Sequence, residues 1–220
     1  MMLELIPQLV NLFAAVILVL AFAMLAQRRI VNLINLYALQ GLSVVCATTV
    51  VAYVTHQHHL YFSAGLTLIL KVFFIPWVLH RLVKRLNVRW DVETLINIPS
   101  TMLVGIVLVV FAFNLALPIA RLSTSITPGT LGIALACILL SFMMMITRSK
   151  ALPQVIGFLS MENALFFAAT SATYGMPMVV ELGIALDVLV GVFILGVFMF
   201  QIREQFESLD ISHLENLKEE

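Results

Sequence analysis

The sequence predicts an all-α integral membrane protein with about seven transmembrane helices, and composition is the first reason. Of the 220 residues, 62% belong to the hydrophobic set, the mean hydropathy is +1.08, and only 12 basic and 12 acidic side chains are present. A soluble domain carries about twice that charged fraction. A water-soluble chain of 24.4 kDa cannot hide so many apolar side chains, because most residues of a small domain touch solvent. At roughly 20 apolar residues per crossing plus short connections, the length allows about seven crossings.

The second reason is the spacing of the apolar runs. Basic turns, a histidine-rich turn and short polar connections separate these runs along the chain. They predict helices over 3–27, 30–54, 60–80, 95–119, 128–147, 151–174 and 178–202. Prolines support these boundaries, because a missing N–H costs little in the first turn of a helix. The prolines in or just before predicted first turns are Pro7, Pro99, Pro128, Pro153 and Pro177.

The third reason is the distribution of Lys and Arg, which also predicts the orientation. With the N-terminus outside, only Arg121 falls on the outer side, Lys71 stays within the membrane, and the other ten basic residues fall on the inner side. This bias predicts an N-out, C-in topology. We interpret the longest inner connection, 81–94, as a basic membrane-surface anchor that includes Trp90. The inner basic residues are Arg28, Arg29, Arg81, Lys84, Arg85, Arg89, Arg148, Lys150, Arg203 and Lys218.

The spans divide into two halves joined by one helix. Residues 1–94 form an N-terminal three-helix half with a basic cytoplasmic loop, 95–127 form a linking helix, and 128–220 form a C-terminal three-helix half with a cytoplasmic tail. One hypothesis is that the halves are a weak tandem duplication, because the linking helix restores the sense of crossing. The alternative is a chance match in an apolar background. The corresponding positions are Arg28 with Lys150, Gln40 with Glu162, and Lys71 with Asp187.

Three ionisable residues stand out near the middle of predicted spans, where each costs several kcal/mol by insertion scales. Lys71, Glu162 and Asp187 each lie roughly 14 to 17 Å into a hydrocarbon core about 30 Å thick. We therefore expect a polar layer near the midplane, in which Lys71 neutralises one of the two carboxylates. Gln40 lies at a depth like that of Glu162 and supplies an uncharged donor and acceptor that extends a hydrogen-bonded water chain. The alternative is a static ion pair that only fixes helix packing.

Small residues and one proline flank this layer. Gly183 and Gly191 lie four residues before and after Asp187, so they leave a strip on which another helix or water approaches. Pro76 follows Lys71 and frees the carbonyl of Val72, which favours a kink next to the lysine. Interrupted helices of this kind line cavities.

Other chemistry-bearing residues are less informative. His56, His58 and His59 resemble a metal-ligand cluster, but histidines in an outer loop are more often solvated, and we predict no metal site. Cys46 and Cys137 lie in separate apolar stretches and form no disulfide framework. The chain contains no Walker loop, dinucleotide-binding glycine motif, nucleophile elbow, HExxH or CxxC pattern. We therefore expect no redox or hydrolytic chemistry in this chain itself.

Four segments carry a family resemblance. They are Ile156-Gly-Phe-Leu-Ser-Met-Glu-Asn163, Ala185-Leu-Asp187, Leu209-Asp-Ile-Ser-His-Leu-Glu-Asn-Leu217 and Lys71-Val-Phe-Phe-Ile-Pro76. With them the whole chain resembles the hydrogenase-4 component E (HyfE) family. Residues 128–217 are also similar to the three-helix NuoK subunit of respiratory complex I and to the C subunit of multisubunit cation/proton antiporters. In NuoK-like subunits two intramembrane glutamates on adjacent helices carry protons, and by motif Glu162 matches the first.

The resemblance implies a multi-pass subunit in the cell inner membrane, within a complex-I-related proton-translocating [NiFe] hydrogenase of the hydrogenase-4 or formate hydrogenlyase type. Asp187 stands where the family has its second glutamate, at a shorter spacing, and Gln40 and Lys71 occupy the analogous places in the N-terminal half. The implied partners are antiporter-like membrane subunits, a membrane anchor subunit and peripheral hydrogenase subunits, besides the lipid bilayer. Those partners would hold the [NiFe] centre and the iron–sulfur clusters, and we expect no cofactor in this chain and no nucleic-acid partner.

Two alternatives to this function stay open at the level of sequence. The chain could be a subunit of a multisubunit sodium/proton antiporter, which has no redox partner. It could also be a non-conducting scaffold that joins the peripheral hydrogenase arm to antiporter-like subunits, with its charges serving assembly only.

Overall fold

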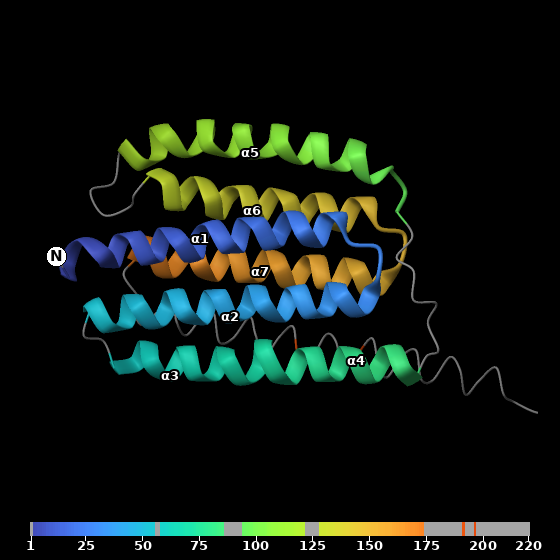
Figure 1. The fold of residues 1–220 in the computed structure, drawn as a ribbon, viewed down its shortest axis with the longest axis horizontal. Coiled ribbons are helices and arrows are strands. Elements are labelled where there is room, and N and C mark those ends of the chain that lie inside the picture. The colour runs from blue at the N-terminus through green and yellow to red at the C-terminus, as the bar shows by residue number, and fades with distance from the viewer. Residues whose placement is uncertain are drawn as a thin grey trace, which may run out of the picture.

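The computed structural model describes residues 2–55, 58–85, 94–121 and 128–173, together with Gly191 and Gly196. Within these residues the chain is helical and contains no β-sheet (Figure 1). Six helical segments are long and apolar enough to cross a membrane, which supports a multi-pass membrane protein. The predicted seventh span, 178–202, lies outside the described residues except for Gly191 and Gly196. The elements are α1 (Met2–Ala26), α2 (Ile30–Thr55), α3 (His58–Thr67), η1 (Leu68–Phe74), α4 (Ile75–Arg85), α5 (Ile98–Arg121), α6 (Pro128–Thr147) and α7 (Ala151–Thr173).

The third span differs most from its prediction. It runs through α3, η1 and α4 without a break, and η1 is a π-helix. The predicted end at residue 80 is wrong, because the helix continues to Arg85. Its last turns are amphipathic, so Arg81 and Lys84 are exposed while Leu82 and Val83 are buried. The helix therefore continues past the point where the hydropathy falls.

Two further boundaries differ slightly from expectation. The helix α5 begins at Ile98, three residues after the predicted start, and Pro99 lies in its first turn as expected. The helix α1 begins at Met2, which puts Pro7 in the second turn and not in the first. The prolines at the starts of α6 and α7 occupy first-turn positions, where their rings match the helical φ angle.

The helices pack as an up-and-down bundle. Both α1 and α7 pack against α2 and against α6, and these four helices hold most of the buried apolar side chains. The helix α5 covers α6 at one edge, and the third span lies against α2 at the other edge (Figure 1). Large apolar side chains on α5, such as Leu103, Ile106 and Phe111, are exposed. They suit a surface that faces lipid or another subunit.

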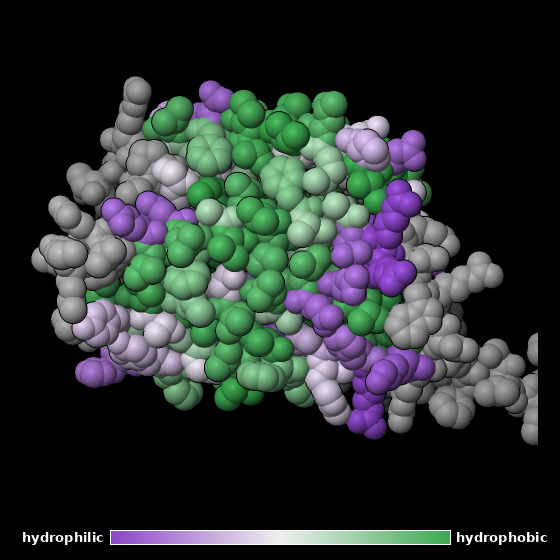
Figure 2. Space-filling model, viewed as in Figure 1, coloured by the Kyte–Doolittle hydropathy of each residue, from purple (hydrophilic) through white to green (hydrophobic). Residues whose placement is uncertain are grey.

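The described basic side chains outside the apolar belt gather at one end of the bundle, which we call the basic end. It contains the C-termini of α1, α4 and α6 and the N-termini of α2, α5 and α7. An apolar belt covers the middle of the visible face, and the larger cluster of hydrophilic side chains lies at this end (Figure 2). We call the other end, at Thr55 and His58, the distal end. The described basic residues at the basic end are Arg28, Arg29, Arg81, Lys84, Arg148 and Lys150.

The buried side chain of Arg148 binds the end of α1 at the basic end. Its side chain is buried, and its Nη2 donates hydrogen bonds to the carbonyls of Met24 at 3.2 Å and Leu25 at 2.8 Å. These carbonyls belong to the last turn of α1, where carbonyls lack intrahelical partners and the dipole favours a cation; the Met24 carbonyl also accepts the N–H of Gln27 at 3.2 Å. Backbone pairing of Thr94 with Arg148 also holds the start of α5 there. Burial lowers the pKa of the Arg148 guanidinium, which nonetheless keeps its proton because arginine does not deprotonate in proteins.

Candidate functional site

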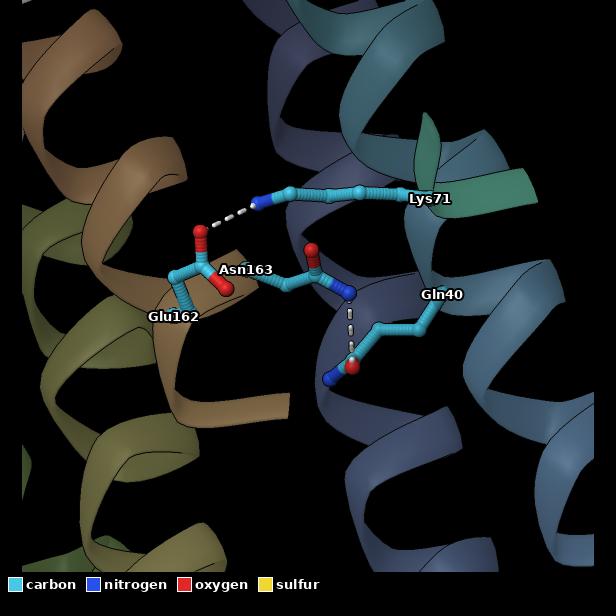
Figure 3. A network of polar contacts seen from close by, with 4 residues as sticks. All are labelled: Gln40, Lys71, Glu162 and Asn163. Carbon is cyan, nitrogen blue, oxygen red and sulfur yellow. Dashed lines mark hydrogen bonds and ion pairs between the residues drawn. The ribbon is translucent and has the colours of Figure 1, made fainter. Parts of the chain in front are cut away.

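A buried ion pair lies near the middle of the bundle. The Nζ atom of Lys71 on η1 is 3.2 Å from Oε1 of Glu162 on α7, and the two side chains are 1% and 4% exposed (Figure 3). Glu162 is the twelfth residue of α7, so it lies roughly 17 Å from the start of that helix. Two residues 91 positions apart in the sequence thus meet at mid-depth, where each compensates the charge of the other.

The π-helical turn positions the lysine. Lys71 is the central residue of η1, and the N–H of Ile75 at its end donates to the carbonyl of Leu70, five residues back. Pro76 follows directly and has no N–H to donate, so an ordinary α-helical bond to Val72 cannot form. The expected kink therefore takes the form of a widened turn in a continuous helix. Such turns are rare and are found frequently at functional sites.

Two neighbours shape the space around the lysine. A Cβ atom added at Gly41 of α2 would lie 3.4 Å from the Cβ of Lys71, so the glycine lets η1 approach α2 closely. On the other side the Nζ of Lys71 is 5.5 Å from the centroid of the Phe166 ring. Phe166 lies one turn beyond Glu162 on α7, so the carboxylate and the ring face together meet the ammonium.

A second buried polar contact lies beside the ion pair. The Nδ2 of Asn163 donates to the Oε1 of Gln40 at 3.3 Å, and both residues are 0% exposed. Figure 3 shows the two amides side by side with Lys71 and Glu162, between α2 and α7. The Asn163 Oδ1 and the Gln40 Nε2 have no hydrogen-bond partner among the described residues, although both atoms are buried.

Comparison with known proteins gives one relevant relative. The uncharacterized protein Rv0085 of Mycobacterium tuberculosis is 32% identical over 151 residues, which cover 68% of this chain and 69% of that protein. The chain belongs to the Rv0085 family. No protein-family model matches it, and no solved structure matches it. The name of Rv0085 states no activity, so the chemistry of this family member has to be argued from the site.

The structure of this Rv0085 relative brings three of the predicted site residues together, and a fourth residue that was not predicted, Asn163, lies beside them. Lys71, Glu162 and Gln40 meet as one buried group, whereas Asp187 lies outside the described residues. Asn163 was missed, although a polar residue beside Glu162 at mid-depth in an apolar run is the same kind of signal. Of the flanking residues, Gly183 is outside the described part. Gly191 is helical, and a Cβ atom placed there would meet no heavy atom within 4 Å.

Metal binding finds no support in the described part of this Rv0085 relative. Residues 2–55, 58–85, 94–121 and 128–173 contain no group of three His, Cys, Asp or Glu side chains that could hold a metal ion. His58 begins α3, and His56 lies outside the described residues. Cys46 and Cys137 are free thiols.

The site of this Rv0085 relative combines two ionisable side chains with two neutral amides. Taking two charges out of water costs several kcal/mol per ion, and a close opposite charge offsets that cost only while both groups stay ionised. A proton placed on Glu162 would remove the countercharge of Lys71 and leave a buried ammonium uncompensated. The buried amides add polar atoms that bind water but do not themselves change charge.

Proposed function

We propose that this chain is a membrane-arm subunit of a complex-I-related proton-translocating [NiFe] hydrogenase in the cell inner membrane, and that it contributes intramembrane carboxylates to the proton path. The observation that carries the proposal is the buried contact of 3.2 Å between Lys71 and Glu162. An ionisable pair at this depth is costly and marks proton or ion pathways in membrane proteins. The resemblance of the chain to the HyfE and NuoK families supplies the kind of complex.

In this proposal Glu162 and Asp187 exchange a proton through water. Lys71 favours the ionised form of the carboxylate that it contacts, and a change in a neighbouring subunit moves the lysine toward or away from that carboxylate. The π-helical turn supports this role, because a turn with altered hydrogen bonding is a place where a helix changes shape at modest cost. Asp187 enters this scheme from the sequence alone.

Redox chemistry belongs to the partners in this scheme. Peripheral hydrogenase subunits would hold the [NiFe] centre and the iron–sulfur clusters, and a membrane anchor subunit and antiporter-like subunits would adjoin this chain. The bundle supports such contacts with the exposed apolar side of α5, which packs only partly against α6 and α1. The inner side of the membrane would adjoin the basic end, in accordance with the positive-inside rule.

The deciding experiment replaces the carboxylate without changing its size. Glu162→Gln should leave hydrogen oxidation by the detergent-solubilised complex measurable with an artificial electron acceptor, while proton uptake coupled to turnover in vesicles falls strongly. The matched control is Glu162→Asp, which keeps the titrating group and should retain part of the coupled uptake. Undiminished proton uptake in Glu162→Gln would contradict the proposal.

Copurification separates this proposal from the antiporter and scaffold interpretations. A tagged copy purified in mild detergent should bring down a nickel-containing subunit, which mass spectrometry and metal analysis identify. Antiporter subunits without nickel would support the sodium/proton antiporter. For a scaffold, neutral replacement of Lys71 and both carboxylates should lower the yield of the complex but leave the proton uptake of each assembled complex unchanged.

A further inference from the structure

The buried face of the third span changes its character at Lys71. Toward the distal end it presents Ser63 and Thr67, which are 0% and 2% exposed. Toward the basic end the same face continues with apolar side chains that are equally buried. These are Ile75, Leu79 and Val83, at 2%, 1% and 3% exposure.

The π-helical turn keeps these residues on one face. The six positions from Ser63 to Val83 are spaced by four residues, and in a pure α-helix of 3.6 residues per turn such a series drifts around the axis. A turn closed by hydrogen bonds to the fifth residue holds more residues, so η1 corrects part of the drift. One continuous buried stripe therefore runs along the span, polar in its distal half and apolar in its basic half.

The partner helix α7 also buries polar side chains toward the distal end, beyond the buried rings of Phe166 and Phe167. Toward the distal end from Glu162 it buries Thr170, which is 2% exposed, and the buried Oγ of Ser171. Toward the basic end it buries Leu159, Ile156 and Leu152. Ser160 is an exception close to mid-depth, and its hydroxyl accepts a hydrogen bond from Ser141 at 2.9 Å.

The helix α2 follows this pattern. It buries Ser43 and Thr48 in its distal half. In its basic half it buries Ile30, Leu33 and Ile34, and the polar exception is Tyr37, one turn from Gln40. On all three helices, buried polar atoms extend from the ion pair toward the distal end, whereas few lie between the ion pair and the basic end.

Several of these polar atoms have capacity for hydrogen bonds that the described part of the chain does not fill. Among the described residues, the Oγ atoms of Ser63 and Ser171 are buried without a hydrogen-bond partner, as are the Nε2 of Gln40 and the Oδ1 of Asn163. The hydroxyls of Thr48 and Thr170 donate to carbonyls of their own helices and keep acceptor lone pairs. Buried polar groups in native proteins are paired with protein or with ordered water. Ordered water is the partner that we infer for these atoms.

We propose that a water-filled half-channel leads from the distal end to the Lys71–Glu162 pair, and that the basic half of the same three helices is a dry apolar seal. Through this chain, the pair then exchanges protons with only one side of the membrane, which is the side opposite the basic end. That protons use the channel rests on the proposed function, whereas the one-sided access of water to the pair does not. Transfer toward the other side requires a neighbouring subunit or a change in the bundle.

Cysteine substitutions along the stripe test the access. In full-length chain with Cys46→Ala and Cys137→Ala, assembled in its native membranes, single thiols are placed by Ser63→Cys and Thr67→Cys in the distal half. The matched controls are Ile75→Cys and Leu79→Cys in the basic half. The probe is the silver ion, which is small enough to follow water and binds thiols. Chloride-free vesicles of the two opposite orientations are exposed briefly to silver nitrate, and remaining thiols are then labelled with a maleimide in denaturant.

The expected result is loss of maleimide labelling at residues 63 and 67 when silver is added to the distal side, and full labelling at residues 75 and 79 from either side. Two distal variants are used so that misfolding of one leaves the other informative. Loss of labelling at residues 75 and 79, equal loss from both sides, or full labelling at both distal positions would overturn the half-channel. Normal proton uptake in Glu162→Gln together with one-sided silver access would instead reject the proton-path function and leave the channel standing.

Discussion

Gly41 of α2 lies directly against Lys71 of the π-helical turn: a Cβ atom placed at Gly41 would be 3.4 Å from the Cβ of Lys71 and 3.7 Å from a methyl group of Val72. This contact brings α2 and η1 together at the depth of the ion pair. Because the space holds one methyl group at the limit of van der Waals contact, the size of the residue at position 41 controls how closely η1 approaches.

Enlarging this residue should separate α2 from η1. Gly41→Ala should be tolerated, whereas Gly41→Leu should lower the free energy of unfolding by about 1 to 3 kcal/mol, as overpacking does. Thermal unfolding in mild detergent measures the effect. Gly65→Leu is the control, because a Cβ atom at Gly65 meets nothing within 4 Å and the position is exposed. Equal destabilisation by the two leucines would show that the packing at Gly41 is no tighter than the packing at Gly65.

The ion pair should appear as an energetic coupling between its two residues. Lys71→Met removes the cation 3.2 Å from the Glu162 carboxylate, and breaking a buried pair on one side costs about 3 to 5 kcal/mol. The double variant Lys71→Met with Glu162→Gln should be less destabilised than the sum of the two single variants. A double-mutant cycle of unfolding free energies in detergent measures a coupling of about 0.5 to 3 kcal/mol. Strict additivity would mean that the two charges do not interact.

The amide contact makes a similar prediction on a smaller scale. Asn163→Leu removes the donor to the Gln40 Oε1 and leaves that buried oxygen unpaired, which costs about 1 to 3 kcal/mol. Adding Gln40→Leu should restore part of the loss, because no buried amide then lacks its partner. Asn114→Leu is the matched control, since Asn114 is exposed and bonds only to its own helix at Val110. That control should change stability by no more than about 0.5 kcal/mol.

Arg148 should stabilise the basic end far more than the exposed arginines do. Arg148→Met removes two hydrogen bonds to the end of α1, and hydrogen bonds to charged groups contribute about 1.5 to 3 kcal/mol. Arg28→Met, at an exposed position in the same end, should have little effect on stability. The midpoint of thermal unfolding in detergent compares the two. If both variants unfolded at the same temperature, the α1 contact would contribute nothing measurable.

The sequence predicted the six described spans well because hydropathy alone marks membrane helices. The predicted 128–147 and 151–174 differ from α6 and α7 by at most one residue at an end. The end of the third span was wrong because hydropathy falls where Arg81 and Lys84 appear, whereas backbone hydrogen bonding continues to Arg85. An amphipathic last turn satisfies both conditions, and a search for apolar runs does not detect it.

The geometry of the site was less accessible to sequence reasoning. Depth counting placed Lys71, Gln40 and Glu162 in one layer, but it did not determine which carboxylate the lysine contacts. Asn163 was not predicted, because an uncharged amide costs less in a membrane than a charge does and its partner Gln40 lies 123 positions away in the sequence. The π-helical turn was anticipated only as a kink at Pro76, since the register of backbone bonds depends on the packing of η1 against α2. Arg148 counted as a topology marker, although it is buried, because no local pattern records a contact between residues 123 positions apart.

That last contact also constrains how the chain is made. The final turn of α1 receives its hydrogen bonds from Arg148, which is synthesised only after α2, the third span, α5 and α6. During biosynthesis the first helix therefore lacks these two hydrogen bonds until more than half of the polypeptide has followed it. Arg148 lies in the turn between α6 and α7, so the end of the fifth described crossing supplies the donor that completes the hydrogen bonding of the first.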